Sequence, residues 1–239
     1  MSERILFNKM ASSSKNSATL KNYIEYDTEL FMLSKPELTE KKHVLGVYNE
    51  IAYNFKDTRA YKWYWVEDFM QRFEGTNELI YDIGCGSGRN LRSNLNMIGV
   101  DNCESFLDIC RKENKNVVKG CMTNLPLETN SGSALMCIAA FHHLSTHNRR
   151  IKALEEMKRV LKPHSIILLS VWSINQPKKT RRKFTYGNNI VPWNKEGVIY
   201  KRYYYIFKRA EIEELFKYVG LKIIDYKWDC GNEIYTLET

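Results

Sequence analysis

The clearest chemistry in the chain is offered by an acidic residue followed by glycines at alternate positions, in Asp82-Ile83-Gly84-Cys85-Gly86-Ser87-Gly88. The segment follows a hydrophobic run, and glycines let a bulky ligand approach the backbone at the carboxyl end of a strand. A dehydrogenase loop has its third glycine one residue later and holds a pyrophosphate at a helix N-terminus. An acid repels a pyrophosphate but attracts a ligand with an ammonium and a sulfonium, such as S-adenosylmethionine.

A second acid supports the same ligand. Asp101 ends the apolar run that begins at Met97, and it lies 19 residues after Asp82. An acid at this distance in an open parallel sheet accepts hydrogen bonds from ribose hydroxyls. We therefore predict that Asp82, Gly84, Gly86, Asp101 and Asn102 bind S-adenosylmethionine.

Two adjacent histidines, His142 and His143, follow the apolar run at residues 134–141. Strand ends beside the switch point of such a sheet line the ligand crevice. We expect at least one of the two to face the transferred methyl group, and we assign His142 a catalytic role and His143 a role in substrate binding. A purely structural role for a histidine is the simpler alternative.

Positive charge is concentrated between Trp172 and Arg209. The whole chain has a net charge of +8, whereas this segment alone has ten basic residues and one acid. Aromatic residues are interleaved with the basic ones, which suits unpaired RNA because cations hold phosphates and rings stack on bases. A solvated charged surface, or a core contribution from Tyr203 and Tyr205, is the alternative. The predicted RNA-binding residues here are Trp172, Lys178, Lys179, Arg181, Arg182, Lys183, Trp193, Arg202 and Tyr204.

The elements that must position these residues follow from short apolar runs that alternate with helical segments. The runs occupy residues 79–84, 97–101, 116–120, 134–141, 165–172 and 221–228. Strands of this kind form a parallel sheet covered on both faces. The predicted fold class is α/β, with a doubly wound, mostly parallel seven-stranded sheet and a basic aromatic insertion.

Helices are predicted from apolar residues at three- and four-residue steps, over 44–55 and 63–73 before the sheet. A third helix over 151–161 ends before Pro163, and a helix is also expected to begin after the glycine loop. Residues 1–33 are expected to form a variable, flexible extension, with a mitochondrial presequence as the alternative. Residues 34–239 should form one domain, with the insertion at about 173–205.

Composition favours a cytoplasmic protein, with a nuclear fraction left open. No apolar run is long enough for a membrane span or a secretory signal. Six cysteines without a C-x-x-C pair favour reduced, mostly buried thiols over disulfides or a zinc site. We expect no metal, no membrane association and no DNA partner.

From about His43 to its end, the chain resembles the eukaryotic tRNA wobble-uridine carboxymethyl methyltransferases, which methylate the carboxylate of 5-carboxymethyluridine in the anticodon. The glycine loop places the chain only in the wider class I methyltransferase superfamily, whereas two later segments point to this family. The matching segments are 47–52, 58–59, 82–88, 97–101, 124–126, 138–139, 142–143, Arg149-Arg150, Val171-Trp172, and the two specific ones, Val191-Pro192-Trp193 and Arg202-Tyr203-Tyr204.

The resemblance implies S-adenosylmethionine as the cofactor and adds Tyr48, Phe55, Cys121, Met122 and Ala139 to the residues that bind it. It implies that Arg59 and His142 aim the substrate carboxylate, that Trp172 and Trp193 enclose the wobble base, and that the basic residues hold phosphates of the anticodon loop. It also implies a heterodimer with a small zinc-binding methyltransferase activator protein, whose added strand we place beside residues 116–120.

The sequence departs from the family pattern at four positions. Cys121 stands where an Asp contacts the adenine amino group, Cys103 replaces a Ser, Tyr205 a His, and Glu233 a Trp. Two other functions therefore stay open. One is a class I methyltransferase of a small molecule, such as a quinone or sterol precursor, and the other is an inactive methyltransferase fold that binds RNA.

Overall fold

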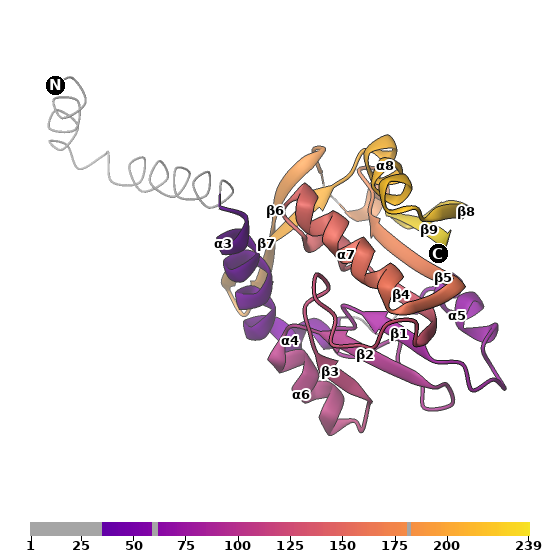
Figure 1. Cartoon of the computed structure of the whole chain (residues 1–239). Helices are drawn as coiled ribbons and strands as arrows, with labels where there is room; N and C mark the ends of the chain where they lie inside the picture. The colour runs from indigo at the N-terminus through magenta and orange to yellow at the C-terminus, as the bar shows by residue number, and fades with distance from the viewer. Residues whose placement is uncertain (1–34, 59–61, 181–182) are drawn as a thin grey trace, which may run out of the picture.

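The computed structural model describes residues 35–58, 62–180 and 183–239 (Figure 1). The predicted extension at residues 1–33, Arg59, Arg181 and Arg182 lie outside these ranges. Seven strands form one sheet in the order β3-β2-β1-β4-β5-β9-β8, and β6 and β7 form a separate hairpin. No helix within the described ranges is long and apolar enough to cross a membrane.

Five strands of the sheet are parallel. β1 (Ile80–Ile83) lies between β2 (Met97–Asp101) and β4 (Gly132–Ile138), β3 (Val117–Lys119) forms one edge, and β5 (Leu161–Trp172) follows β4. β9 (Asn232–Glu238) and β8 (Lys222–Asp229) complete the sheet as antiparallel strands. The predicted mostly parallel seven-stranded sheet is confirmed. β9 was not predicted because polar residues, Asn232, Glu233 and Thr236, leave it with only short apolar runs.

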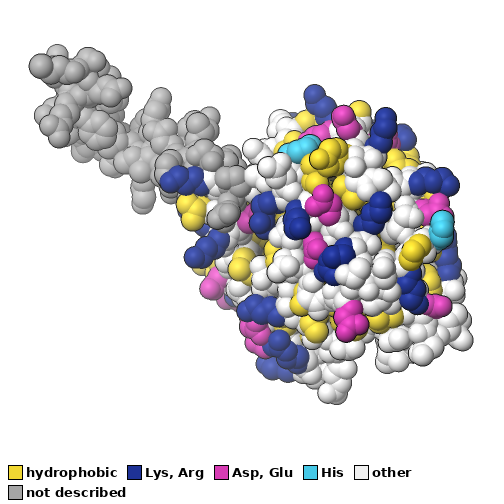
Figure 2. Space-filling model, viewed as in Figure 1, with side chains coloured by type: hydrophobic (Ala, Val, Ile, Leu, Met, Phe, Trp, Pro, Cys, Tyr) yellow, Lys and Arg dark blue, Asp and Glu magenta, His cyan; other side chains and the backbone are white. Residues whose placement is uncertain are grey.

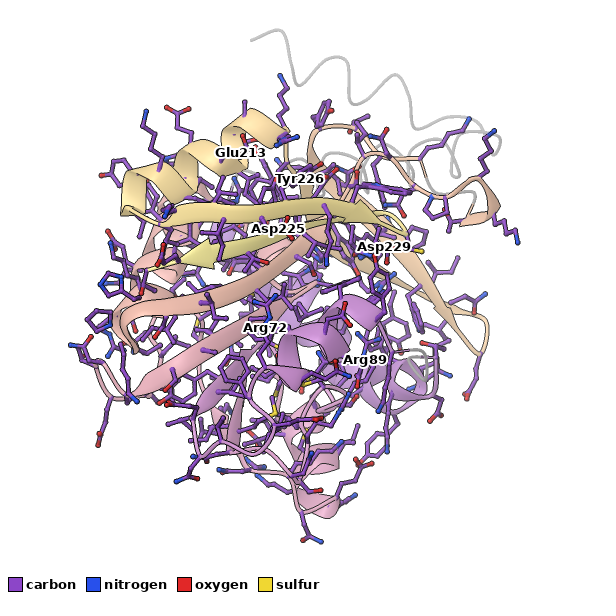
Figure 3. The ribbon with its side chains drawn as sticks, turned by 90° about the vertical axis from the view of Figure 1, so that its right-hand side faces the viewer. Arg72, Arg89, Glu213, Asp225, Tyr226 and Asp229 are labelled. Atoms are coloured by element: carbon purple, nitrogen blue, oxygen red, sulfur yellow. The ribbon has the colours of Figure 1, made fainter. Side chains whose placement is uncertain are left out.

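Helices cover both faces of the sheet because alternate strand residues point to opposite sides. On one face, Leu135 and Ile167 pack with α7 (His147–Arg159) and α8 (Arg209–Val219). On the other, Met136 and Leu168 pack with α5 (Tyr64–Gln71). Figure 3 shows α8 lying along β8, where Glu213 approaches Tyr226. The predicted helices at 63–73 and 151–161 correspond to α5 and α7.

A helical segment precedes the sheet and packs beside its β3 end (Figure 1). α3 (Pro36–Glu40), a π-helix (Lys41–Gly46) and α4 (Val47–Asp57) follow one another without a break. Apolar residues of α4 form a small core with α6 (Glu104–Lys112), which connects β2 to β3. This core holds α4 over the loops at the carboxyl ends of β1 and β2.

No helix follows the glycine loop, so this prediction is wrong. Residues 84–95 form successive turns, in which the Gly88 amide donates to the Cys85 carbonyl and the Leu91 amide donates to the Gly88 carbonyl. Short polar residues such as Asn90 and Ser93 favour turns over helix, because their side chains compete for backbone hydrogen bonds.

The basic segment forms a β-hairpin of β6 (Gly187–Lys195) and β7 (Val198–Ile206), for which the sequence analysis named no structure. Its two-residue turn, Glu196-Gly197, has φ angles of 53° and 87°, as a tight hairpin turn requires. β7 contacts the 3-10 helix η2 (Phe141–His143). This contact brings the aromatic residues of β7 to the histidine pair.

Candidate functional site

The glycine loop allows close approach to its backbone. Gly84 and Gly86 have φ angles of 73° and 55°, in the left-handed region that glycine tolerates best. A Cβ atom on Gly84 would lie 2.4 Å from the Cβ of Ala140. The bend after β1 therefore requires glycine for both conformation and space.

Asp82 carries a buried carboxylate without a partner. Its side chain is 1% exposed, and neither oxygen has a hydrogen-bond partner among the described residues. Burial raises its pKa to about 7, and Asp101 adds to this effect while Arg89 opposes it. A cationic ligand at the loop would favour the ionised form.

Asp101 organises the loop instead of standing free. Its Oδ2 accepts a hydrogen bond from the Gly86 amide at 2.8 Å, and its Oδ1 accepts one from the Cys103 amide at 2.8 Å. Burial raises the pKa of this carboxyl group, and the backbone bonds oppose the shift. Each carboxylate oxygen has a second lone pair, so a ribose hydroxyl can still donate to it.

A cavity of about 470 Å³ lies over the carboxyl ends of β1, β2 and β4. Nine of the ten predicted cofactor residues line it: Tyr48, Phe55, Gly84, Gly86, Asp101, Asn102, Cys121, Met122 and Ala139. Asp82 is not in its wall. The orphaned carboxylate near the glycine loop, and the ribose acceptor Asp101, fit a cofactor with a cationic end and a nucleoside.

An ion pair borders the cavity at Cys121, the residue that departs from the family pattern. Arg149 donates to both carboxylate oxygens of Glu40 at 2.9 and 3.0 Å, and its Nη2 lies 3.7 Å from the Cys121 sulfur. Glu40 also accepts a bond from the Ser145 amide at 2.7 Å. Glu40 and Arg149 were not among the predicted site residues. Arg149 was visible only as part of the family resemblance, and Glu40 had no signal in the sequence.

The two histidines occupy different positions. His143 lines the cavity, whereas His142 is fully buried and is not in the wall. The Trp172 amide donates to Nδ1 of His142 at 3.1 Å, which leaves the proton of the neutral ring on Nε2. That Nε2 has no partner among the described residues, and burial lowers the pKa of the ring well below its usual value.

His143 is bonded through both ring nitrogens. Its Nδ1 donates to the Tyr203 carbonyl at 2.7 Å, so its Nε2 accepts from the Tyr48 hydroxyl at 3.1 Å. Burial lowers the pKa of His143 to about 4. The ring is therefore neutral at physiological pH.

The chain of hydrogen bonds continues from Tyr48 to the hairpin. The Tyr48 hydroxyl lies 3.0 Å from that of Tyr204, which accepts a bond from Nη1 of Arg202 at 2.8 Å. The only consistent direction runs from Arg202 through Tyr204 and Tyr48 to His143. Burial raises the pKa of Tyr48 well above its usual value, so its hydroxyl keeps its proton.

Aromatic rings form the wall beyond the histidine. Trp172 stacks on Tyr204 with ring centroids 4.2 Å apart and planes at 11°, and both rings line the cavity. Asn232, at the start of β9, also lines it, and its buried Oδ1 has no partner among the described residues. Asn232 was not predicted as a site residue because β9 was not predicted as a strand.

The predicted RNA residues do not all meet at this cavity. Trp172 and Tyr204 line it, whereas Lys183, Trp193 and Arg202 line a second, neighbouring cavity. Lys178 and Lys179 are exposed on the 3-10 helix η3 (Lys178–Thr180). On the face in Figure 2, basic and acidic side chains are intermixed, unlike in the basic segment.

Comparisons with known sequences agree with this geometry. A profile described as "Methyltransferase domain" matches residues 81–169, which include the glycine loop and the histidine pair. A tRNA (carboxymethyluridine(34)-5-O)-methyltransferase of Arabidopsis thaliana is 41% identical over 145 residues, covering 60% of this chain and 35% of that protein. ALKBH8 of Mus musculus, with the same enzyme name, is 36% identical over 66% of this chain and 24% of its own length. The chain thus spans a quarter to a third of these relatives.

Solved structures show the same fold. An S-adenosylmethionine-dependent methyltransferase from Clostridium acetobutylicum has a TM-score of 0.60 at 15% identity, covering 80% of this chain and 98% of that one. A putative methyltransferase from Haloferax volcanii, solved in complex with the activator Trm112, has a TM-score of 0.56 at 15% identity over 80% and 96% of the two chains. The predicted class I fold and its cofactor, S-adenosylmethionine, are confirmed.

One relative is matched nearly end to end. The tRNA (carboxymethyluridine(34)-5-O)-methyltransferase of Schizosaccharomyces pombe is 31% identical over 218 residues, which cover 81% of this chain and 94% of that protein. A match of this extent leaves little of that protein outside the comparison. The chain belongs to the tRNA (carboxymethyluridine(34)-5-O)-methyltransferase family.

Proposed function

We propose that the protein transfers a methyl group from S-adenosylmethionine to the carboxylate of 5-carboxymethyluridine at the wobble position of tRNA, forming a methyl ester. The observation that carries the proposal is the state of His143 beside the cofactor residues. Both its ring nitrogens are bonded to protein groups, so it does not serve as a free base. A carboxylate needs none, because with a pKa of about 4 it is already ionised at neutral pH.

Catalysis by this chain then depends on positioning. S-adenosylmethionine supplies a methyl group on a positively charged sulfur. Asp82 attracts the cationic end of the cofactor, and Asp101 with Asn102 holds its ribose. The bonded wall of Tyr48, His143 and Tyr204 fixes the acceptor side, and orienting reactants in this way removes several kcal/mol from a barrier.

The uracil ring has a flat surface available. Trp172 and Tyr204 are stacked at the cavity, and the bond from the Trp172 amide to His142 holds that strand end. We propose that Trp172 encloses the base, that His142 orients Trp172, and that Arg59 aims the carboxylate. Lys178, Lys179 and Lys183, with Arg181 and Arg182, hold phosphates of the anticodon loop.

We also propose a small zinc-binding activator protein as partner. β3 is an edge strand of the sheet, with β2 on one side only. An added strand satisfies the unpaired backbone groups of such an edge. A neighbour of the same fold was solved with an activator, which supports this choice.

The test is transfer of labelled methyl from S-adenosylmethionine to tRNA that lacks the wobble ester, by protein co-expressed with the activator. Label that enters tRNA and leaves under mild alkali supports ester formation. Alkali-stable label indicates methylation of a base or ribose and contradicts the proposal. Cofactor binding without any transfer favours a small-molecule substrate or an inactive fold that binds RNA.

A further inference from the structure

A second cavity, of about 530 Å³, lies between the β6–β7 hairpin and the C-terminal end of α4. Its wall includes Asn54, Thr58, Lys183, Trp193 and Arg202. Two of its described lining residues are cations and none is an acid. Its charge therefore favours an anionic ligand.

Arg202 is the unusual group in this wall. It is 2% exposed, and it belongs to no ion pair within the described part of the chain. Its neighbours are the Tyr204 hydroxyl and two rings: its guanidinium carbon lies 4.9 Å from the Trp193 centroid and 5.3 Å from that of Tyr204. Its Nε has no hydrogen-bond partner among the residues that the structure describes.

The other deeply buried arginine shows the contrast. Arg150 is 3% exposed, yet it donates to the Leu144 carbonyl at 3.1 Å and lies 3.9 Å from a carboxylate oxygen of Glu211. Burying a guanidinium without a counter-charge costs free energy. An anion in the second cavity would give Arg202 the counter-charge that Glu211 gives Arg150.

The second cavity lies beside the cofactor cavity, and residues of the two walls contact one another. Trp193, which lines the second, contacts Phe55, which lines the first, with centroids 5.3 Å apart. Arg202 is linked by hydrogen bonds through Tyr204 and Tyr48 to His143. A ligand bound at Arg202 therefore lies next to the acceptor side of the cofactor cavity.

We propose that the second cavity is an oxyanion subsite for the RNA, in which Arg202 receives an anionic group of the nucleotide that is methylated or of its immediate neighbour. The anion is either the carboxymethyl carboxylate or a backbone phosphate, since a guanidinium binds both through the same N–H donors. The inference rests on the proposed function, and it adds the group that reads the substrate's charge.

The first experiment needs no RNA. Inorganic phosphate should raise the melting temperature of the cofactor-bound wild type in proportion to binding, and Arg202→Gln should abolish the increase. Lys183→Gln, at an exposed lining position, should reduce it, whereas Lys217→Gln, at an exposed position outside the cavity, should not. An equal increase in wild type and Arg202→Gln overturns the proposal. Unchanged S-adenosylmethionine affinity of each variant serves as the check on folding.

The second experiment identifies the source of the anion with anticodon stem-loop RNAs. Arg202→Gln should weaken binding about 30-fold. If Arg202→Gln loses affinity only for RNA that contains 5-carboxymethyluridine, the anion is the carboxylate. If Arg202→Gln loses as much affinity for RNA with unmodified uridine, the anion is a phosphate. Replacing that neighbouring phosphate with a neutral methylphosphonate should then abolish the difference in affinity between Arg202→Gln and wild type. RNA affinity unchanged in both Arg202→Gln and Lys183→Gln overturns the subsite. The wild type could also bind phosphate through Arg202 but bind no RNA. That result would contradict the proposed function but would still support an oxyanion site at Arg202.

Discussion

The hydroxyl of Tyr48 lies 3.1 Å from Nε2 of His143, although 95 positions separate the two residues in the chain. The bond joins α4 to the turn after β4, where the cofactor residues meet the aromatic residues of the hairpin. It also determines what the histidine can do, because a neutral ring bonded at both nitrogens positions a substrate but does not take its proton.

Tyr48→Phe should lower the rate of methyl transfer about tenfold, because it removes the only donor to Nε2 of His143 that the structure shows. The fold and the edge contact of its ring with Phe55 should survive. Single-turnover kinetics with saturating cofactor measure the effect. Tyr53→Phe is the control, since that hydroxyl is exposed and only accepts a bond from Lys112. Equal rates for Tyr48→Phe and wild type would exclude a positioning role for the bond.

Asp82 should make the stability of the cofactor-free protein depend on pH. Its pKa is about 7 in the folded state and near 3.8 when unfolded, so the folded carboxyl keeps its proton where the unfolded one loses it. The stabilising contribution is complete below pH 4 and is lost as the pH rises through about 7, a change of about 4 kcal/mol. Asp82→Asn should remove this part of the pH dependence in urea unfolding, whereas Asp57→Asn, at an exposed acid, should leave it. Parallel pH profiles for Asp82→Asn and wild type would contradict the assignment.

The same carboxylate should control cofactor affinity. Asp82→Asn should weaken S-adenosylmethionine binding about 100-fold, because the cationic end of the cofactor loses its buried counter-charge. Wild-type affinity should increase as the pH rises through about 7, where Asp82 ionises. Isothermal titration calorimetry at pH 6 and pH 8 measures both effects, and Asp57→Asn is again the control. An affinity independent of pH would refute the role of Asp82.

Gly84→Ala should be more damaging than Gly75→Ala. The two glycines have nearly equal φ angles, 73° and 74°, so the conformational cost of about 1–2 kcal/mol is common to both. Only at Gly84 would the new Cβ meet another atom, 2.4 Å away, whereas nothing lies within 4 Å at Gly75. The steric cost of about 2 kcal/mol should appear as the difference between the two variants in urea unfolding. Equal losses would mean that Ala140 moves aside.

Replacing Lys178, Lys179 and Lys183 with Gln should weaken tRNA binding and reduce the slope of log affinity against log salt by about 2 to 3, because each phosphate contact releases counterions. Fluorescence anisotropy at several salt concentrations measures the slope. Three exposed lysines elsewhere, Lys162, Lys217 and Lys222, provide a triple variant of equal charge. An unchanged slope for the first triple variant would place the RNA surface elsewhere.

The edge of β3 allows a selective test of the activator. The Gly99 amide donates to the Asn116 carbonyl and the Gly120 amide to the Asp101 carbonyl, so even-numbered residues bond to β2 and the Val117 amide faces outward. Val117→Pro should therefore abolish co-purification with the activator while keeping the sheet. Ile224→Pro, at the bulge of the opposite edge strand, is the control. Undiminished co-purification of Val117→Pro would exclude strand addition at β3.

Part of the cofactor end of the site was predictable because several of its residues directly follow a strand. Gly84 follows β1, Asn102 follows β2 and Ala139 follows β4, and all three line one cavity. In a parallel sheet these strand ends meet at one edge, so a local pattern determines a tertiary position. The apolar runs revealed six strands, and in β1 and β4 the run is continuous because these strands are buried on both faces.

Other features were decided only by tertiary packing. No pattern in the sequence predicted the turns after the glycine loop or the position of Asn232 in β9. Nor did any pattern predict that His143 lines the cofactor cavity while His142 is buried behind it. Glu40 meets Arg149 across 109 residues, and Tyr48 meets Tyr204 across 156. The periodicity of apolar residues predicts that a side chain is buried. Which residue that side chain contacts depends on how the hairpin packs on η2. For the same reason composition revealed the charge of the basic segment, whereas only the fold showed that Arg202 is buried with no counter-charge in the described part of the chain.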